Sequence, residues 1–187
     1  MKNTPLLAAG LALVAVPALA HPHFGKSITA KLPGVEVTIT YDTTPANEAR
    51  AQAAKVGEFV TPRRPMLKLS GELKTGKATI PAGEYTIGVI KLGDKEWTMA
   101  LYPGRLARTD TPDAAKAIRL ESRFSSAHGS AEHMLIDVTP GEGTFENKAV
   151  LTLHFGTLHL AGVLAEAGAA PAAAPRPPAA ASTPNKP

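Results

Sequence analysis

The stretch IPAGEYTIGVIKLGDKEWTMALYPG, residues 80–104, carries the clearest folding signal of this chain. It begins with a Pro-Ala-Gly turn, continues as an apolar segment over residues 85–91, turns at Gly93-Asp94 and returns over residues 97–102. Glycine and aspartate tolerate the backbone angles of tight turns, and two β-prone segments around such a turn indicate an antiparallel hairpin. The sequence therefore predicts a β-rich fold around this hairpin.

Alternation of apolar and polar residues predicts further strands on both sides of the hairpin. The period of two is clearest at residues 35–41 and 134–138, and residues 66–69 form a shorter candidate. Residues 118–124 also alternate. They predict one continuous strand whose outer face carries Arg119, Glu121 and Arg123.

The apolar positions of residues 149–164 change parity halfway along the segment. They are odd-numbered in the first half and even-numbered in the second, so a bulge or turn at Gly156-Thr157 is needed to keep both sets inward. If the leucines face the core throughout, His154 and His159 both face outward. We therefore expect these two imidazoles to lie close together.

One helix is predicted, over residues 45–57. Thr44 suits the N-cap, Pro45 suits the first helical position, and an alanine-rich run leads to Gly57 as a C-terminal stop. A face made mainly of alanine can pack only lightly against a sheet. About seven to nine strands with one short helix indicate a mainly β protein, an antiparallel β-sandwich or open barrel.

The two ends of the chain differ in composition from its middle. Residues 1–20 contain Lys2, an apolar run and the small-residue site Ala18-Leu19-Ala20, which together are typical of a secretory signal peptide. Residues 165–187 are rich in alanine and proline and predict a disordered tail. One domain of residues 21–164 remains. We expect a periplasmic or secreted protein, with no membrane span after signal cleavage.

Charge and composition argue against nucleic acid as a partner. The chain has 20 basic and 16 acidic side chains, and removal of residues 1–20 leaves a formal charge of +3. The charges are scattered and only 5% of residues are aromatic, whereas nucleic-acid binders concentrate basic and stacking residues. No cysteine is present, so the fold stands without disulfides.

Residues 80–101 resemble a known family. The positions Pro81, Ala82, Gly83, Tyr85 and Trp97 are similar to the "lpAGtYsL…W" signature of exported bacterial proteins grouped as domain of unknown function 2911. The resemblance extends over most of residues 24–164. It implies an exported β-rich domain, with a tight turn followed by a core aromatic, and it implies no particular reaction.

Histidines offer the most specific chemical hypothesis, because imidazole is a common ligand of copper and zinc. Cleavage after Ala20 would give His21 a free α-amine beside its own imidazole, a pair that can chelate copper. The alternative amino-terminal copper motif has histidine in the third position and also binds the metal through the intervening backbone amide nitrogens. Pro22 blocks this motif, because proline has no N–H to lose. Further nitrogens would come from the other candidate metal ligands, His23, His154 and His159. The alternative is that all of these histidines are exposed to solvent and bind no metal.

Catalytic signals are weak. The chain has no Gly-x-Ser-x-Gly elbow, phosphate loop or dinucleotide fingerprint, and the Ser- and His-containing residues 125–130 suit a polar loop. Arg63-Arg64, between two prolines, is a possible anion contact. The favoured hypothesis is an exported, non-catalytic module that binds an unknown small molecule or envelope component. A periplasmic copper-binding protein is the alternative, and an exported hydrolase is third.

Overall fold

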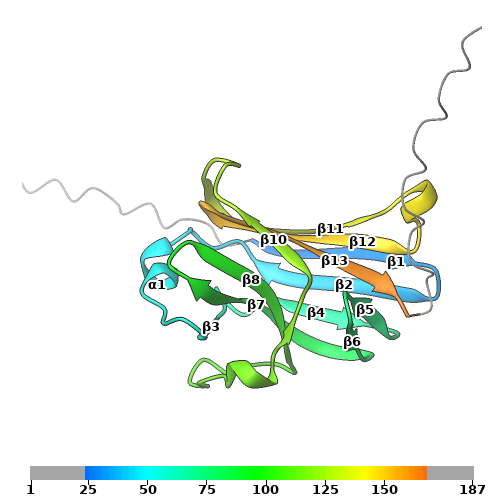
Figure 1. Ribbon diagram of the computed structural model, residues 1–187, viewed down its shortest axis with the longest axis horizontal. Coiled ribbons are helices and arrows are strands. Elements are labelled where there is room, and N and C mark those ends of the chain that lie inside the picture. The colour runs from blue at the N-terminus through cyan, green and yellow to red at the C-terminus, as the bar shows by residue number, and fades with distance from the viewer. Residues whose placement is uncertain (1–23, 168–187) are drawn as a thin grey trace, which may run out of the picture.

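The computed structural model describes residues 24–167, which form a sandwich of two antiparallel sheets (Figure 1). The predicted fold class, a mainly β protein with an antiparallel β-sandwich, is confirmed. The predicted signal peptide at residues 1–20, His21 and His23 lie outside the described residues, as does the tail from residue 168 onward. Within the described residues, no helix is long and apolar enough to cross a bilayer.

The first sheet contains seven strands and is built around the predicted hairpin. In order, its strands are β1 (Gly25–Leu32), β2 (Val35–Asp42), β4 (Met66–Leu69), β7 (Gly83–Gly93), β8 (Glu96–Pro103) and β9 (Ile118–Arg119), and β3 (Phe59–Val60) pairs with β7. The hairpin is formed by β7 and β8, with a register shift between Lys91 and Gly93 beside the turn. The turn itself is Asp94-Lys95, one residue later than the predicted Gly93-Asp94, because Gly93 is the last residue of β7.

The second sheet contains six strands. In order, these are β11 (Ala131–Pro140), β12 (Lys148–Gly156), β13 (Leu158–Glu166), β5 (Leu73–Thr75) and β6 (Ala78–Ile80), and β10 (Ser122–Ser125) also pairs with β13. The last strand runs two residues past the predicted domain end, because Ala165 and Glu166 pair with β5. β10 pairs with the first part of β13, along the same edge that β5 occupies further on.

The thirteen strands of the described residues exceed the seven to nine expected. Four of them, β3, β5, β6 and β9, are only two or three residues long. The nine longer strands agree with the expectation. Two single-turn 3-10 helices, Ala114–Lys116 and Gly143–Phe145, lie in the connections.

The core lies between the facing sheets, as strand alternation requires. Val37 and Ile39 of β2 are fully buried, as are Leu151 and Leu160 from the opposite sheet. Tyr85 and Trp97 belong to the same core, which confirms the expected core aromatic after the tight turn. The Tyr85 hydroxyl donates to the carbonyl of Pro81 at 2.6 Å, and burial raises the pKa of this phenol.

The helix is much shorter than predicted. Only α1, Glu48–Gln52, is helical, and its N-cap is Asn47 instead of Thr44. The carbonyl of Thr44 accepts from the N–H of Met134, and the N–H of Ala46 donates to Glu132. These bonds to β11 hold the predicted first turn extended, so tertiary pairing overrides the local helix signal.

Residues 118–124 are also not one strand, which corrects the prediction of a continuous charged face. Ile118 and Arg119 belong to the first sheet, whereas the chain from Ser122 onward belongs to the second. Leu120, between them, is buried in the core. This corner carries the chain from one sheet to the other while the apolar alternation continues.

The parity change within residues 149–164 corresponds to a hairpin turn. Phe155 and Leu158 face each other across β12 and β13, with Gly156-Thr157 between them. Gly156 has φ +60°, a conformation that favours glycine. The predicted turn is therefore confirmed, and the odd and even apolar positions both face the core.

Candidate functional site

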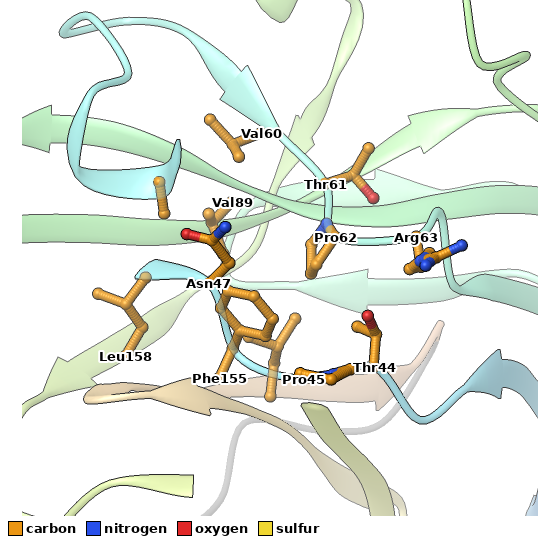
Figure 2. Close-up of a pocket in the computed structure, with 12 residues that line it drawn as sticks. Thr44, Pro45, Asn47, Val60, Thr61, Pro62, Arg63, Val89, Phe155 and Leu158 are labelled. Carbon is orange, nitrogen blue, oxygen red and sulfur yellow. The ribbon is translucent and has the colours of Figure 1, made fainter. Parts of the chain in front are cut away.

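A pocket of about 210 Å³ lies at one end of the sandwich, between the two sheets and beside α1 (Figure 2). Its wall is mainly apolar. Val89 contributes from the first sheet, Leu153, Phe155 and Leu158 from the β12–β13 hairpin, and Ala51 from the helix. The pocket is therefore a part of the core that remains open where the sheets separate around α1.

Polar side chains lie around this apolar wall. Thr44, Asn47, Thr61 and Arg63 all line the pocket. Figure 2 shows Asn47 at one end and Arg63 and Thr44 at the other, with Pro62 and Phe155 facing each other between them. An apolar body with polar groups at its ends is the usual construction of a small-molecule site.

Two tertiary contacts hold the helical wall of the pocket. The Glu48 carboxylate accepts from the backbone N–H of Thr157 at 2.5 Å and from its hydroxyl at 2.8 Å. At the other end of α1, the buried Lys91 ammonium donates to the carbonyls of Gln52 and Ala54 at 2.8 and 3.1 Å. The short helix is thus positioned by side chains from both sheets.

The loop of residues 62–65, Pro-Arg-Arg-Pro, forms the opposite wall and is called the arginine loop below. Arg63 and Arg64 both have φ 51°, which is unfavourable for residues with a side chain. The loop is held to β7 on both sides, because the Thr61 hydroxyl donates to the Ile87 carbonyl and the Ile87 N–H donates to Pro65. Such conformations persist where the surrounding structure enforces them, and they concentrate at ligand sites.

The arginine loop also separates the pocket from two open hollows of about 710 and 470 Å³. Arg63 and Arg64 line both hollows, Arg108 lines the larger and Arg105 the smaller. Within the described residues, none of these four guanidinium groups forms an ion pair or hydrogen bond. Their donors therefore remain available to an anion.

The pocket has the groups for binding and lacks those for acid–base chemistry. Among the described residues that line it, none is a histidine or a carboxylate, and the Thr61 hydroxyl already donates to a backbone carbonyl. A hydroxyl nucleophile needs an adjacent base. This site can therefore hold a ligand, but it contains no pair of residues that would activate a nucleophile.

The sequence-predicted metal ligands are only partly covered by the described residues. His154 and His159 are direct cross-strand partners, and their ring centroids lie 5.2 Å apart. Their predicted proximity is confirmed. His128, which the sequence placed in a polar loop, lies against them with its ring centroid 4.0 Å from that of His159. We call His128, His154 and His159 the imidazole cluster.

The environment of His159 favours its neutral form. Burial lowers the pKa of His159, and the neighbouring His128 and His154 lower it further. The Nε2 atom of His154 lies 3.4 Å from the carbonyl oxygen of Gly129, so in a hydrogen bond it is the donor. In the described residues, no three His, Cys, Asp or Glu side chains are already arranged around one ion position.

Glycoside hydrolysis needs a pair of carboxylates close together, and the glutamates of the two sheets are dispersed. Glu84 and Glu96 lie at opposite ends of the β7–β8 hairpin, Glu121 lies at the corner before β10, and Glu132 lies on β11. The Ser125 hydroxyl accepts from the N–H of Ala127, as expected for a polar loop. None of these residues lines the pocket.

Comparisons of the chain with protein-family models, with curated proteins and with solved structures find no match. The resemblance to domain of unknown function 2911 stays a prediction, carried by the motif at residues 81–97. The function is therefore inferred from the pocket and its charges.

Proposed function

We propose that this protein is a binding module for a small molecule with an apolar body and an anionic group. The apolar body occupies the pocket beside α1, and Arg63 contacts the anion. The single observation that carries this proposal is the meeting of an open apolar cavity with an arginine that has no partner within the described residues. The predicted signal peptide adds that binding takes place in the periplasm or outside the cell.

The size of the pocket limits the ligand. A volume of about 210 Å³ is smaller than typical drug-sized pockets, which reach roughly 300–1,000 Å³. Phe155 and Pro62 bound it from opposite sides, so a short aliphatic chain or a single ring suits the space better than a branched molecule. Burial of such a body removes apolar surface from water on both partners.

Charge selects among such molecules. Arg63 lies at the end of the pocket that also holds Thr44 (Figure 2). The arginine loop adds Arg64, which lines the adjoining hollow together with Arg63. A guanidinium group matches a carboxylate with two parallel hydrogen bonds. A molecule with a terminal carboxylate can therefore place its charge at Arg63 and its chain among the apolar side chains.

The test is an NMR chemical-shift titration of the tag-free protein with hexanoate and with hexan-1-ol, which share the apolar chain. We expect hexanoate to bind more tightly and to shift resonances around Ala51 and Phe155. Arg63→Gln should weaken hexanoate binding about tenfold, as expected for loss of a charged hydrogen bond near solvent. The exposed Arg123→Gln is the matched control and should change nothing.

A second pair of variants tests the cavity itself. Ala51 is buried and lines the pocket, whereas Ala53 in the same segment is exposed. Ala51→Leu should fill the cavity and abolish hexanoate binding, and Ala53→Leu should leave it intact. Equal binding of hexanoate and hexan-1-ol would contradict the anion contact, and hexanoate binding that survives Ala51→Leu would contradict the pocket.

A further inference from the structure

We propose that His128, His154 and His159 bind one divalent transition-metal ion of the copper or zinc type on the outer face of the second sheet. The site is separate from the pocket. Its ligands come from three neighbouring elements: β12, β13 and the loop that follows β10.

Strand pairing brings the three imidazoles together. His154 and His159 face each other across the β12–β13 hairpin, and Ser125 of β10 pairs with His159 from the other side. His128 follows Ser125 in the loop that connects β10 to β11, which Figure 1 shows above the start of β13. Because the apolar residues of the hairpin point inward, both strand histidines must point outward together.

The distance between His154 and His159 fits a shared ion, whereas His128 must first leave its stack on His159. Imidazole nitrogens lie about 2.0–2.1 Å from zinc, so the ring centroids of two ligands lie roughly 4.5–5.5 Å apart. The His154 and His159 centroids, at 5.2 Å, are within this range, whereas His128 and His159 are stacked at 4.0 Å. His128 is exposed in a loop. Rotation of its ring out of the stack would complete the set.

A hydrogen bond orients one of the three imidazoles. When His154 donates from Nε2 to the Gly129 carbonyl, the lone pair lies on Nδ1. Hydrogen bonds of this kind orient histidine ligands in metal sites.

The ligand type determines the class of ion. Three imidazoles without a carboxylate suit copper and zinc and give no advantage to magnesium or calcium, which prefer oxygen. The Glu48 carboxylate of α1, which reaches the hairpin turn, is already bonded to Thr157. We therefore expect Cu(II) to bind more tightly than Zn(II), and Mg(II) to show no binding.

The test uses the tag-free, chelator-treated protein. Cu(II) binding is followed by visible absorption in competition with a chelator, and Zn(II) binding by NMR of the imidazole nitrogens. We expect one equivalent of either ion, shifts of the imidazole signals of the cluster with Zn(II), and at least a tenfold loss of Cu(II) affinity in each of His128→Gln, His154→Gln and His159→Gln. Circular dichroism confirms that each variant is folded.

The control variants are His133→Gln, on β11, and the double substitution of His21 and His23 by alanine. Both should retain the Zn(II)-induced shifts of the cluster. Cu(II) binding that is lost with His21 and His23 and unaffected by the cluster variants would overturn the proposal and locate copper at the amino-terminal segment. Absence of any one-equivalent site would overturn it as well.

Discussion

The two faces of the β12–β13 hairpin carry different chemistry within the same few residues. Phe155 and Leu158 point inward and line the apolar pocket, whereas His154 and His159 point outward and belong to the imidazole cluster. Inner positions are enclosed by the opposite sheet and α1, so their shape determines what binds. Outer positions are only half-buried and carry nitrogen donors, so their donor atoms determine what binds. One turn sets the register of both faces.

The largest effect is expected where this shared turn is disturbed. Gly156 has φ +60°, and a Cβ there would overlap the Glu48 carboxylate that holds Thr157. Gly156→Ala should lower the free energy of unfolding by about 2–4 kcal/mol, since it combines a left-handed backbone cost with loss of charged hydrogen bonds. Urea denaturation measures it, and hexanoate and Cu(II) binding should both weaken.

A matched control separates the two contributions at the turn. Gly143 has the same φ of +60°, but no atom lies within 4 Å of a Cβ built there. Gly143→Ala should cost only the backbone part, about 1–2 kcal/mol, and leave both faces of the hairpin intact. Equal losses in the two variants would mean that the contact with Glu48 contributes nothing to the turn.

The next prediction distinguishes the inner face of the hairpin from the outer face, because the substitution acts through α1 alone. The Lys91 ammonium is buried and is bonded to the carbonyls of Gln52 and Ala54. Lys91→Met keeps the length of the side chain but leaves both carbonyls without this donor, so we expect a loss of about 2 kcal/mol in urea denaturation. Hexanoate binding should weaken while Cu(II) binding is unchanged.

Lys95→Met, in the exposed hairpin turn, is the control for removal of a lysine charge. It should shift neither the denaturation midpoint nor either binding equilibrium. If Lys91→Met lowered Cu(II) affinity as strongly as hexanoate affinity, the two faces would be coupled through the sheet.

Features that follow from strand alternation could be predicted from the sequence. The β7–β8 hairpin, the turn at Gly156-Thr157 and the proximity of His154 and His159 all depend on a period of two within one or two adjacent strands. Local alternation is sufficient there because the buried face leaves only one acceptable register.

Features that depend on distant segments could not be predicted. His128 joins the cluster only because β10 pairs with β13, and the first predicted helical turn is lost because Thr44 and Ala46 pair with β11. The pocket requires the two sheets, α1 and the arginine loop to meet. The adjacent arginines of that loop indicate a possible anion contact in the sequence alone, but their left-handed backbone arises from anchoring to Ile87.

A smaller effect of opposite sign is expected in the arginine loop. Arg63 has φ 51°, so Arg63→Gly should raise the free energy of unfolding by about 0.5–1 kcal/mol, because the relief of strain exceeds the added chain entropy. The same variant should lose selectivity for hexanoate over hexan-1-ol. Arg63→Ala, which removes the charge and keeps the strain, should lose selectivity without the gain in stability. A gain in both variants would place the strain in the arginine side chain instead of its backbone.

The smallest effect should come from the outer face, as a pH dependence of stability. Burial, and then the charges of His128 and His154, lower the pKa of His159 below its ordinary value of about 6.5. The unfolded chain therefore binds this proton more readily than the folded chain. The contribution of His159 to the free energy of unfolding is present above pH 6.5 and is lost as the pH falls through the lower pKa of the folded state. The groups that face His159 are His128 and His154, with Arg123 further along β10. Urea denaturation between pH 8 and pH 5 should show a shallower decline for His159→Gln than for the unsubstituted protein, whereas Ala51→Leu, which fills the pocket, should leave the slope unchanged. Saturating Zn(II) should steepen the decline, because protons then compete with the ion for the same nitrogens.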